Sequence, residues 1–520
     1  MRIFAMPLLL ACLLLAGCTG SRGAEDKSED TAGSRAEAQT LRIGVNGLPS
    51  SLANPFRGNG RPGIFVWSQL FDALTRLDEE GALVPALALS WEAEDATHWR
   101  LRLRPGVRFS NGQRFDAPGA AKVLNWLASP EGRRTVVGAE LKAIERAWAA
   151  GPLDLRIATS EPDPILPKRL VSAWMVEPDL WRELGAEGFA QAPVGTGPFR
   201  LLRWDHRQRR VELVASRQSW RSTGWKRLSF IELPDAAVRT QALLSRDVDI
   251  APVEIEEIDR LEERGYPVSV TGSMAVMSIA FRTEGDAASP LRDVRVRRAL
   301  NLAVDKEALA RLLLRGMGRL AGQPAARGVS GQDPAIAPYP YDPRRARELL
   351  AQAGHAQGFD LDIDILTNSL PADSLIYQAV AWQLGEVGVR AHLRVTSLPE
   401  YLRKLATNGW SAGAFGASWN AAPYNDAIRS MESFSCLRAN PFFCDRALAD
   451  RLVTAQRIGD DARREQALRA VGRGFHEAAP ALFLVEQIDL FSYQKDLHNV
   501  TIANRIPAFE TITRAAEARR

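Results

Sequence analysis

The most telling stretch of this chain reads Leu83-Val84-Pro85-Ala86-Leu87-Ala88-Leu89-Ser90-Trp91-Glu92 and then, after a short gap, Trp99-Arg100-Leu101-Arg102-Leu103-Arg104-Pro105-Gly106. Apolar and charged residues alternate strictly over 99–104, which predicts a strand that is buried on one face. Pro105-Gly106 turns the chain, and Ser110-Asn111-Gly112-Gln113 marks a second turn. A strand bounded by tight turns is typical of a sheet in a globular domain.

Short strand patterns alternate with longer helical patterns on either side of this stretch. We expect strands at 41–45, 228–233 and 361–366, a hairpin of 199–204 with 211–214, and helices at 67–77, 293–316 and 341–354. Asp342 and Pro343 open the last helix as cap and first-turn residue, and Gly354 closes it. This alternation predicts α/β domains with mainly parallel or mixed sheets.

The composition is that of a large globular protein. The chain has 520 residues, of which 46% are apolar and 25% charged, enough for two or three domains with a sizeable core. The formal net charge is +4 and no dense tract of Lys and Arg occurs, so we expect no nucleic-acid partner. No apolar run of about 18 residues follows Cys18, so we expect no membrane-spanning helix after it.

Several blocks of the sequence, taken in order, resemble family 5 of the extracellular solute-binding proteins, which are the peptide, oligopeptide and nickel receptors of ABC importers. The blocks span 83–92 with 99–112, 195–199, 242–250, 293–305 and 341–354. The resemblance implies an α/β, two-lobed periplasmic-binding-protein type II fold with an extra subdomain in the first lobe and a two-segment hinge.

The resemblance also implies a domain order. We expect lobe 1 at 41–85 and 191–276, its extra subdomain at 86–190, lobe 2 at 277–485, and a return to lobe 1 at 486–520. The two crossings would lie near 277–283 and 484–493. The lobes would close on a small solute or peptide in the cleft between them and deliver it to permease and ATPase subunits. We expect a monomer without a cofactor.

One segment of lobe 2 bears on the ligand. Peptide-binding members of the family often carry a Trp-x-x-Asp-Tyr segment whose Asp neutralises the ammonium of the peptide. The matching stretch here places Trp419, Asn420, Tyr424 and Asp426 as candidate ligand-binding residues, but the Asp position aligns with Ala422. Trp419 is interpreted either as a platform for the ligand or as a core aromatic residue that braces the hinge. The departure leaves a non-peptide solute (an opine-like conjugate, a sugar or a metal chelate) or a signalling or scaffold lipoprotein open.

Three further residues are candidates for ligand contact. Arg282 follows Phe281 where family members commonly have Asn, and a guanidinium at that position would grip a carboxylate. The alternative is a solvated Arg at a strand edge. Asn46 and Trp67 stand where the first strand and the following helix approach the cleft in relatives.

The sequence contains few of the residue patterns that are typical of metal sites or enzymes. The six histidines, at positions 98, 206, 355, 392, 476 and 498, show no ligand spacing, so no metal site is predicted. Serine chemistry would need a Gly-x-Ser-x-Gly elbow, and none occurs. Gly195-x-Gly197 is followed by Pro198 and a strand, which does not fit a dinucleotide loop. We expect no enzyme.

The N-terminus resembles that of a bacterial lipoprotein. A short apolar run, 7–16, follows the basic Arg2 and ends at Leu15-Ala16-Gly17-Cys18. We expect residues 1–17 to be a signal peptide and Cys18 to carry lipid that anchors the exported protein to a membrane, on the periplasmic or cell-surface side. Residues 18–40 hold almost no large apolar side chain and are expected to form a flexible linker.

Two cysteines remain in the body of the chain. Cys436 and Cys444 flank the turn-prone pair Asn440-Pro441, and an exported compartment favours a disulfide between them. The alternative, a two-thiol metal site, lacks a histidine nearby.

Overall fold

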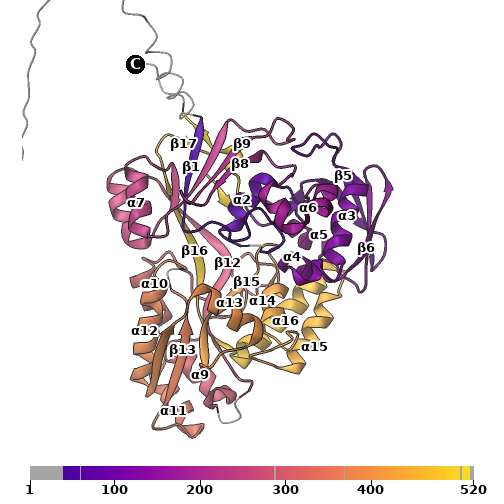
Figure 1. Cartoon of the computed structure of the whole chain (residues 1–520). Coiled ribbons are helices and arrows are strands. Elements are labelled where there is room, and N and C mark those ends of the chain that lie inside the picture. The colour runs from indigo at the N-terminus through magenta and orange to yellow at the C-terminus, as the bar shows by residue number, and fades with distance from the viewer. Residues whose placement is uncertain (1–38, 59, 286–288, 368, 504–505, 516–520) are drawn as a thin grey trace, which may run out of the picture. The chain divides into compact units, whose positions relative to one another are not determined.

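The computed structural model describes residues 39–58, 60–285, 289–367, 369–503 and 506–515. Its largest sheet has ten strands in the order β14-β13-β15-β12-β16-β11-β1-β10-β9-β8 (Figure 1). These strands are β1 (Thr40–Val45), β8 (Phe199–Asp205), β9 (Arg210–Ala215), β10 (Arg227–Glu232), β11 (Ile250–Pro252), β12 (Val268–Phe281), β13 (Phe359–Ile365), β14 (Val389–Val395), β15 (Ala414–Asn420) and β16 (Ala481–Tyr493). Parallel pairs such as β13–β14 and antiparallel pairs such as β8–β9 share the sheet, which confirms the predicted mixed α/β class.

Two long neighbouring strands, β12 and β16, run through the middle of this sheet. Residues 268–272 of β12 pair with 488–492 of β16 on the side of β11, and residues 276–280 pair with 481–486 on the side of β15. Between these two ladders, three residues of β12 (Ser273, Met274 and Ala275) lie opposite a single residue of β16, Gln487. The β12–β16 ladder is interrupted a few residues before the predicted crossing at 277–283, where Met274 has a φ of 52°, and its register shifts again between Met277 and Ser278, inside that range.

The segment 86–190 builds a separate small sheet, and we keep the name subdomain for it. Its strands lie in the order β4-β5-β7-β6, and every pair is antiparallel. The bounds are β4 (Ala88–Ala93), β5 (His98–Leu103), β6 (Ile144–Gly151) and β7 (Asp154–Thr159), with helices α3 (Ala117–Ala128), α4 (Val136–Glu140), α5 (Leu166–Arg169) and α6 (Pro178–Gln191). The alternating stretch 99–104 forms β5 as far as Leu103, which confirms the predicted strand. The short hairpin β2 (Thr75–Leu77) with β3 (Leu83–Pro85) precedes the subdomain.

Helices flank the large sheet in both lobes (Figure 1). Their bounds are α2 (Gly63–Leu70), α7 (Ala236–Leu244), α8 (Ile258–Glu263), α9 (Val294–Leu302), α10 (Lys306–Leu313), α11 (Pro343–Gln352), α12 (Asp373–Glu386), α13 (Leu398–Thr407), α14 (Ala427–Ser433), α15 (Arg446–Gln456) and α16 (Asp461–Ala478). The predicted helix 341–354 is α11, and Asp342 caps it by accepting a hydrogen bond of 2.8 Å from Arg345 N. Gly354 follows with a φ of 88°.

Two predicted helices differ from the structure. The segment 67–77 is helical only to Leu70, because Phe71 is extended and 75–77 pair with β3 as a strand. The segment 293–316 is divided between α9 and α10, because Asp305 caps a new helix by accepting a hydrogen bond of 2.8 Å from Ala308 N.

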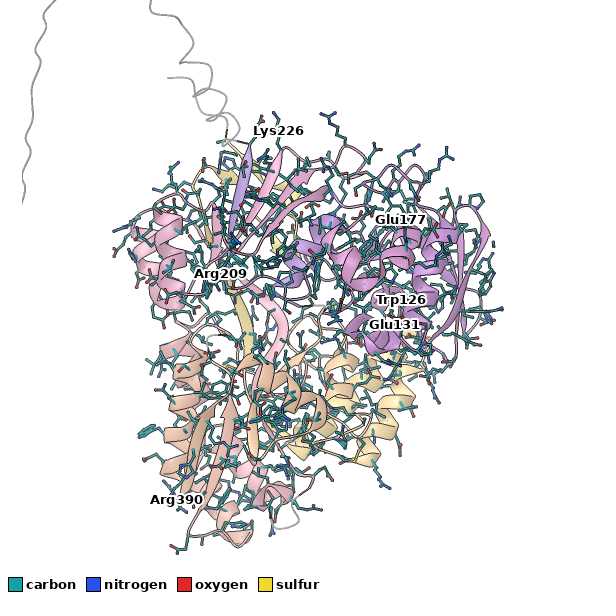
Figure 2. The ribbon with its side chains drawn as sticks, in the orientation of Figure 1. Trp126, Glu131, Glu177, Arg209, Lys226 and Arg390 are labelled. Carbon is teal, nitrogen blue, oxygen red and sulfur yellow. A yellow bond between two sulfur atoms is a disulfide. The ribbon has the colours of Figure 1, made fainter. Side chains whose placement is uncertain are left out.

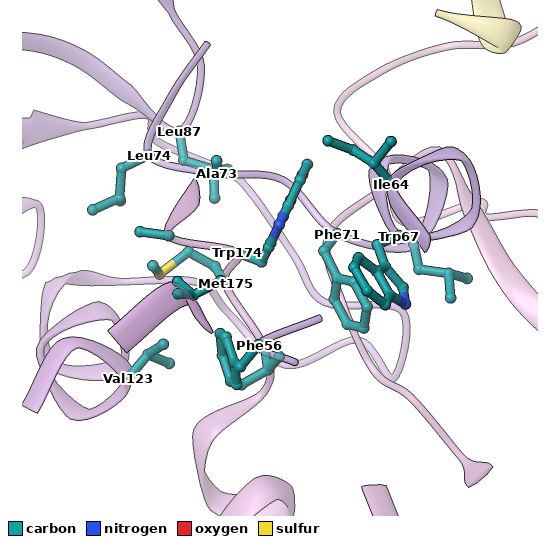
Figure 3. Close-up of a cluster of buried hydrophobic side chains, with 14 of the residues drawn as sticks. Phe56, Ile64, Trp67, Phe71, Ala73, Leu74, Leu87, Val123, Trp174 and Met175 are labelled. Atoms are coloured by element: carbon teal, nitrogen blue, oxygen red, sulfur yellow. The ribbon is translucent and has the colours of Figure 1, made fainter. Parts of the chain in front are cut away.

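The buried side chains form three hydrophobic clusters, one mainly in lobe 1 and the subdomain and two mainly in lobe 2. The first contains Phe56, Trp67, Phe71 and Trp174 (Figure 3). Charged side chains of both signs cover the outside (Figure 2), in pairs such as Arg209 with Glu232 at 2.7 Å and Arg390 with Asp360 at 2.8 Å. Mixed surface charge of this kind agrees with a water-facing protein.

Candidate functional site

A cavity of about 840 Å³ lies between the subdomain and lobe 2. The subdomain side contributes Trp91 of β4, Trp99 of β5, and the proline-rich turn 162–168, and lobe 2 contributes Ser330 and the segment from Arg457 to Glu465. This volume falls in the range of about 300–1,000 Å³ that is usual for small-molecule sites. Aromatic and proline side chains supply apolar walls, and charged groups of both signs supply polar ones.

The proline-rich turn positions the cations of the subdomain wall. Pro162, Pro164 and Pro167 restrict the backbone before and within the short helix α5, which carries Lys168 and Arg169. Lys168 lines the cavity, whereas Arg169 points into the protein and pairs with Asp163 at 3.1 Å. The charge of Asp163 contributes to a raised pKa of the fully buried Arg169 guanidinium, so it stays protonated.

The lobe 2 wall rests on the N-terminal end of α16. Asp460 caps this helix by accepting a hydrogen bond of 2.8 Å from Arg463 N. One turn further, Glu465 accepts hydrogen bonds from Ser330 Oγ at 3.1 Å and Gly331 N at 2.8 Å, which fixes the loop that closes this side of the cavity. Arg464 lines the cavity although its side chain is 5% exposed, and its Nε has no hydrogen-bond partner.

Asp426 lies behind the lining of the cavity and contacts one charged residue of each wall. Its carboxylate accepts from Arg464 Nη1 at 2.8 Å and Nη2 at 2.9 Å, and Lys168 Nζ lies 3.5 Å away. It also caps α14 through Ile428 N at 3.2 Å. Burial works to raise the pKa of Asp426, but the neighbouring Arg464 guanidinium outweighs it, and the pKa lies below its usual value. Asp426 is thus an ionised, fully buried ion-pair partner, which favours a structural role over the ligand-binding role expected from the sequence.

Trp419 is also buried completely. Its ring stacks on Phe434 with centroids 3.8 Å apart and meets Phe475 and Phe483, and its Nε1 donates to Ser278 Oγ at 3.0 Å. With every face covered by protein, this indole offers no platform to a ligand in the present arrangement. The geometry therefore favours the second interpretation, a core aromatic residue.

The neighbours of Trp419 and Asp426 lie at the contact between the lobes. Tyr424 Oη accepts a hydrogen bond of 3.3 Å from Arg169 Nη1, and burial raises the pKa of this phenol well above its usual value. Asn425 Nδ2 donates to Gly81 O of the β2–β3 hairpin at 3.1 Å. Asn420 uses its side chain locally, because its Oδ1 accepts from Ala422 N at 2.8 Å.

Charged pairs continue this contact around the cavity. Arg429 pairs with Glu140 at 2.8 Å, Arg457 pairs with Glu161 at 2.9 Å, and Lys142 lies 3.4 Å from Glu432. In each pair one partner belongs to the subdomain and the other to lobe 2. These pairs contribute to holding the two walls together.

The remaining candidates lie elsewhere. Arg282 follows the end of β12 and donates to three backbone carbonyl oxygens, those of Glu284, Trp410 and Ala412. Trp67 is buried in the lobe 1 cluster and donates to Leu52 O at 2.9 Å (Figure 3). Asn46 is exposed at the end of β1. None of the seven sequence-predicted ligand residues lines the 840 Å³ cavity.

Sequence reasoning missed Trp99, Lys168 and Arg464 as cavity residues. Trp91 and Trp99 stand in the stretch quoted at the outset, and two tryptophans on paired strands were a signal that could have been followed. Lys168 and Arg464 carried no such signal, because the chain holds 66 Lys and Arg residues and their pairing with Asp426 bridges large sequence separations.

Other features bear on the predicted chemistry. Cys436 and Cys444 form a disulfide with Cα atoms 4.6 Å apart. Over the described residues, no cluster of three or more His, Cys, Asp or Glu side chains is placed to hold a metal ion. Within the same part of the chain, no helix combines the length and apolar character needed to cross a bilayer. Cys18 and the predicted signal peptide lie outside the described residues.

Comparisons with known proteins agree with this architecture. Residues 82–440 match the model of the bacterial extracellular solute-binding proteins, family 5. The glutathione-binding protein GsiB of Pectobacterium atrosepticum is 25% identical over 473 residues, which cover 86% of this chain and 89% of that protein.

Two solved structures share the fold. DppA of Helicobacter pylori in complex with the peptide STSA superposes with a TM-score of 0.80 at 19% identity, over 92% of this chain and 98% of that one. NikZ of Campylobacter jejuni in complex with Ni(L-His) gives a TM-score of 0.77 at 20% identity, over 91% of this chain and 97% of that one.

Proposed function

We propose that this chain, which belongs to the bacterial extracellular solute-binding proteins of family 5, is the receptor of an ABC importer for a short peptide or peptide-like solute. The observation that carries the proposal is the 840 Å³ cavity, because lobe 2 and the subdomain of lobe 1 both wall it. A solute that touches both walls favours the closed arrangement over any open one, since only differential affinity shifts such an equilibrium.

The lining of the cavity fits a solute with both polar ends and apolar parts. Lys168 on the subdomain wall suits a carboxylate, and Asp461 on the lobe 2 wall suits an ammonium. Trp91 and Trp99 supply apolar area between such groups. Glutathione and short peptides combine these features, and they are what the relatives GsiB and DppA are named for or hold.

The experiment is calorimetric titration of the purified protein with glutathione, trialanine and Ni(L-His), after native mass spectrometry has identified any small molecule that co-purifies. We expect 1:1 binding of a peptide-like compound. Ala462→Trp would project an indole into the cavity and should weaken binding at least tenfold, whereas Gln466→Trp, on the same helix but outside the lining, should not. Binding of Ni(L-His) alone would assign the chain to chelates, and the absence of any bound compound in both measurements would refute the proposal.

The proposal includes the placement of the protein in the cell. Lipid on Cys18 would anchor it to a membrane, residues 18–40 would serve as a flexible linker, and the monomeric body would present its closed lobes to permease and ATPase subunits. Two or more acyl chains are needed for stable anchoring, which bacterial lipoproteins provide. The family places such receptors outside the cytoplasm, which supports this arrangement.

A further inference from the structure

A second cavity of about 320 Å³ lies within lobe 1, away from the site proposed above. The segment 68–79 forms one side, and residues of the C-terminal segment, including Ala508 and Glu510, form another. Four carboxylates and two guanidinium groups line it, so its wall carries excess negative charge. These charged residues are Asp72, Arg76, Asp78, Glu79, Arg221 and Glu510.

A buried network organises the acidic groups. Asp72 accepts hydrogen bonds from Thr196 Oγ1 at 2.8 Å and Trp220 Nε1 at 2.9 Å, and Arg221 Nε lies 2.9 Å from its other oxygen. Arg221 Nη1 also donates to Glu510 Oε1 at 2.5 Å. Asp72 is therefore supplied with donors, and Arg221 is shared between two carboxylates.

Glu510 is the exception in this network. The residue is 8% exposed, and its second carboxylate oxygen, Oε2, is buried without a hydrogen-bond partner. Leaving a buried acceptor without a donor is unfavourable, and more so where the group is charged. A site in which one carboxylate oxygen lacks a donor is therefore prepared for a donor that arrives from outside.

Aromatic rings complete the wall. Trp174, which is 5% exposed, and Trp220 both line the cavity. Trp220 already attracts a cation, since the guanidinium carbon of Arg104 lies 4.2 Å from its ring centroid. The faces of indole rings attract cations, most strongly where water is excluded. Net negative charge, indole rings and an acceptor without a donor all favour a cationic ligand that carries N–H donors.

We propose that this cavity binds a small protonated primary amine. The ammonium group donates a hydrogen bond to Glu510 Oε2, and its methylene groups pack against Trp174 and Trp220. The volume, at the lower end of the usual range for ligand sites of about 300–1,000 Å³, limits the ligand to a short aliphatic mono- or diamine.

The test is calorimetric titration of the purified full chain with putrescine, followed by the same titration of Glu510→Gln. The amide keeps the shape of the side chain and removes its charge, so we expect saturable 1:1 binding to the original protein and at least a tenfold loss in the variant. Glu254→Gln is the matched control, because Glu254 also pairs with an Arg, at 3.5 Å from Arg239, and does not line the cavity. It should bind putrescine as the original protein does.

A second variant keeps the test decisive if Glu510→Gln does not fold. Ala508→Lys would place an ammonium in the cavity without removing any member of the network, and should abolish putrescine binding. Tetramethylammonium carries the charge without an N–H donor and should bind at least tenfold more weakly than putrescine. The proposal is overturned if putrescine shows no saturable binding, or if it binds Glu510→Gln or Ala508→Lys as tightly as the original protein.

Discussion

Truncation of Trp419 to Ala separates a core residue from a ligand anchor. The indole is completely buried against Phe434, Phe475 and Phe483, so its removal leaves a cavity and should lower the free energy of unfolding by about 3–5 kcal/mol. Trp419→Phe would keep part of the ring packing and lose the donor to the buried Ser278 Oγ, which alone costs about 1–3 kcal/mol. The two variants should therefore form a graded series.

Urea unfolding followed by circular dichroism measures these changes, and titration with glutathione or the solute found by mass spectrometry measures affinity. Trp382→Ala is the control, since that indole is 68% exposed on α12 and its loss should change stability by less than about 0.5 kcal/mol. We expect the folded fraction of Trp419→Ala to retain its affinity. A loss of affinity of about thirtyfold or more, equivalent to about 2 kcal/mol, with stability nearly unchanged would refute the assignment to the core.

Three other features can be tested in the same way: the ion pair of Asp426, the lipid anchor and the disulfide. Arg464→Met should destabilise the protein by about 3–5 kcal/mol because it removes the bidentate partner of the buried Asp426 carboxylate and leaves only Lys168, at 3.5 Å, and adding Asp426→Leu should restore most of that loss in the same urea assay. The pKa of Asp426 is lower in the folded than in the unfolded state, so the contribution of its carboxylate to stability is complete above about pH 4 and is lost as the pH falls further. The free energy of unfolding should therefore fall less over this acid range in the double variant than in the original protein. Equal falls would contradict the description of Asp426 as a buried, ionised ion-pair partner. Cys18→Ser should appear in the soluble fraction, and retention on salt-washed membranes would count against a lipid anchor. Cys436 and Cys444 should resist alkylation in exported, unreduced protein, and two modified thiols would argue against the disulfide.

Local patterns predicted the local elements well. The alternation at 99–104 is visible in β5, and the Asp-Pro pair before α11 caps that helix as expected, because both signals act within a few residues. Contacts between segments that are distant in the sequence could not be predicted from such local patterns. The partners of Asp426 stand 38 residues away, at Arg464, and 258 residues away, at Lys168, so nothing near Asp426 in the sequence distinguishes a buried ion pair from a ligand contact.

The same limit explains the segments that were assigned wrongly. The apolar spacing over 67–77 fits a helix, but Thr75 to Leu77 pair with Leu83 to Pro85, and that pairing is decided by the hairpin rather than by the spacing. Arg282 uses its guanidinium donors on the carbonyl oxygens of Glu284, Trp410 and Ala412, and the last two stand 128 and 130 residues away, so no local pattern predicts this use. An interruption of a strand by Ser273, Met274 and Ala275 has no clear signature in composition.

The interruption in β12 also bears on how the lobes can move. Antiparallel pairing on both sides of Ser273 to Ala275, with one further register shift between Met277 and Ser278, ties each half of the strand to β16. A rotation of lobe 2 can then be absorbed by the backbone torsions of these few residues and of Gln487 opposite them, while the two ladders stay intact. Amide protons at 273–275 should consequently exchange with solvent faster than those of the ladders on either side, because their opening requires no cooperative loss of the sheet.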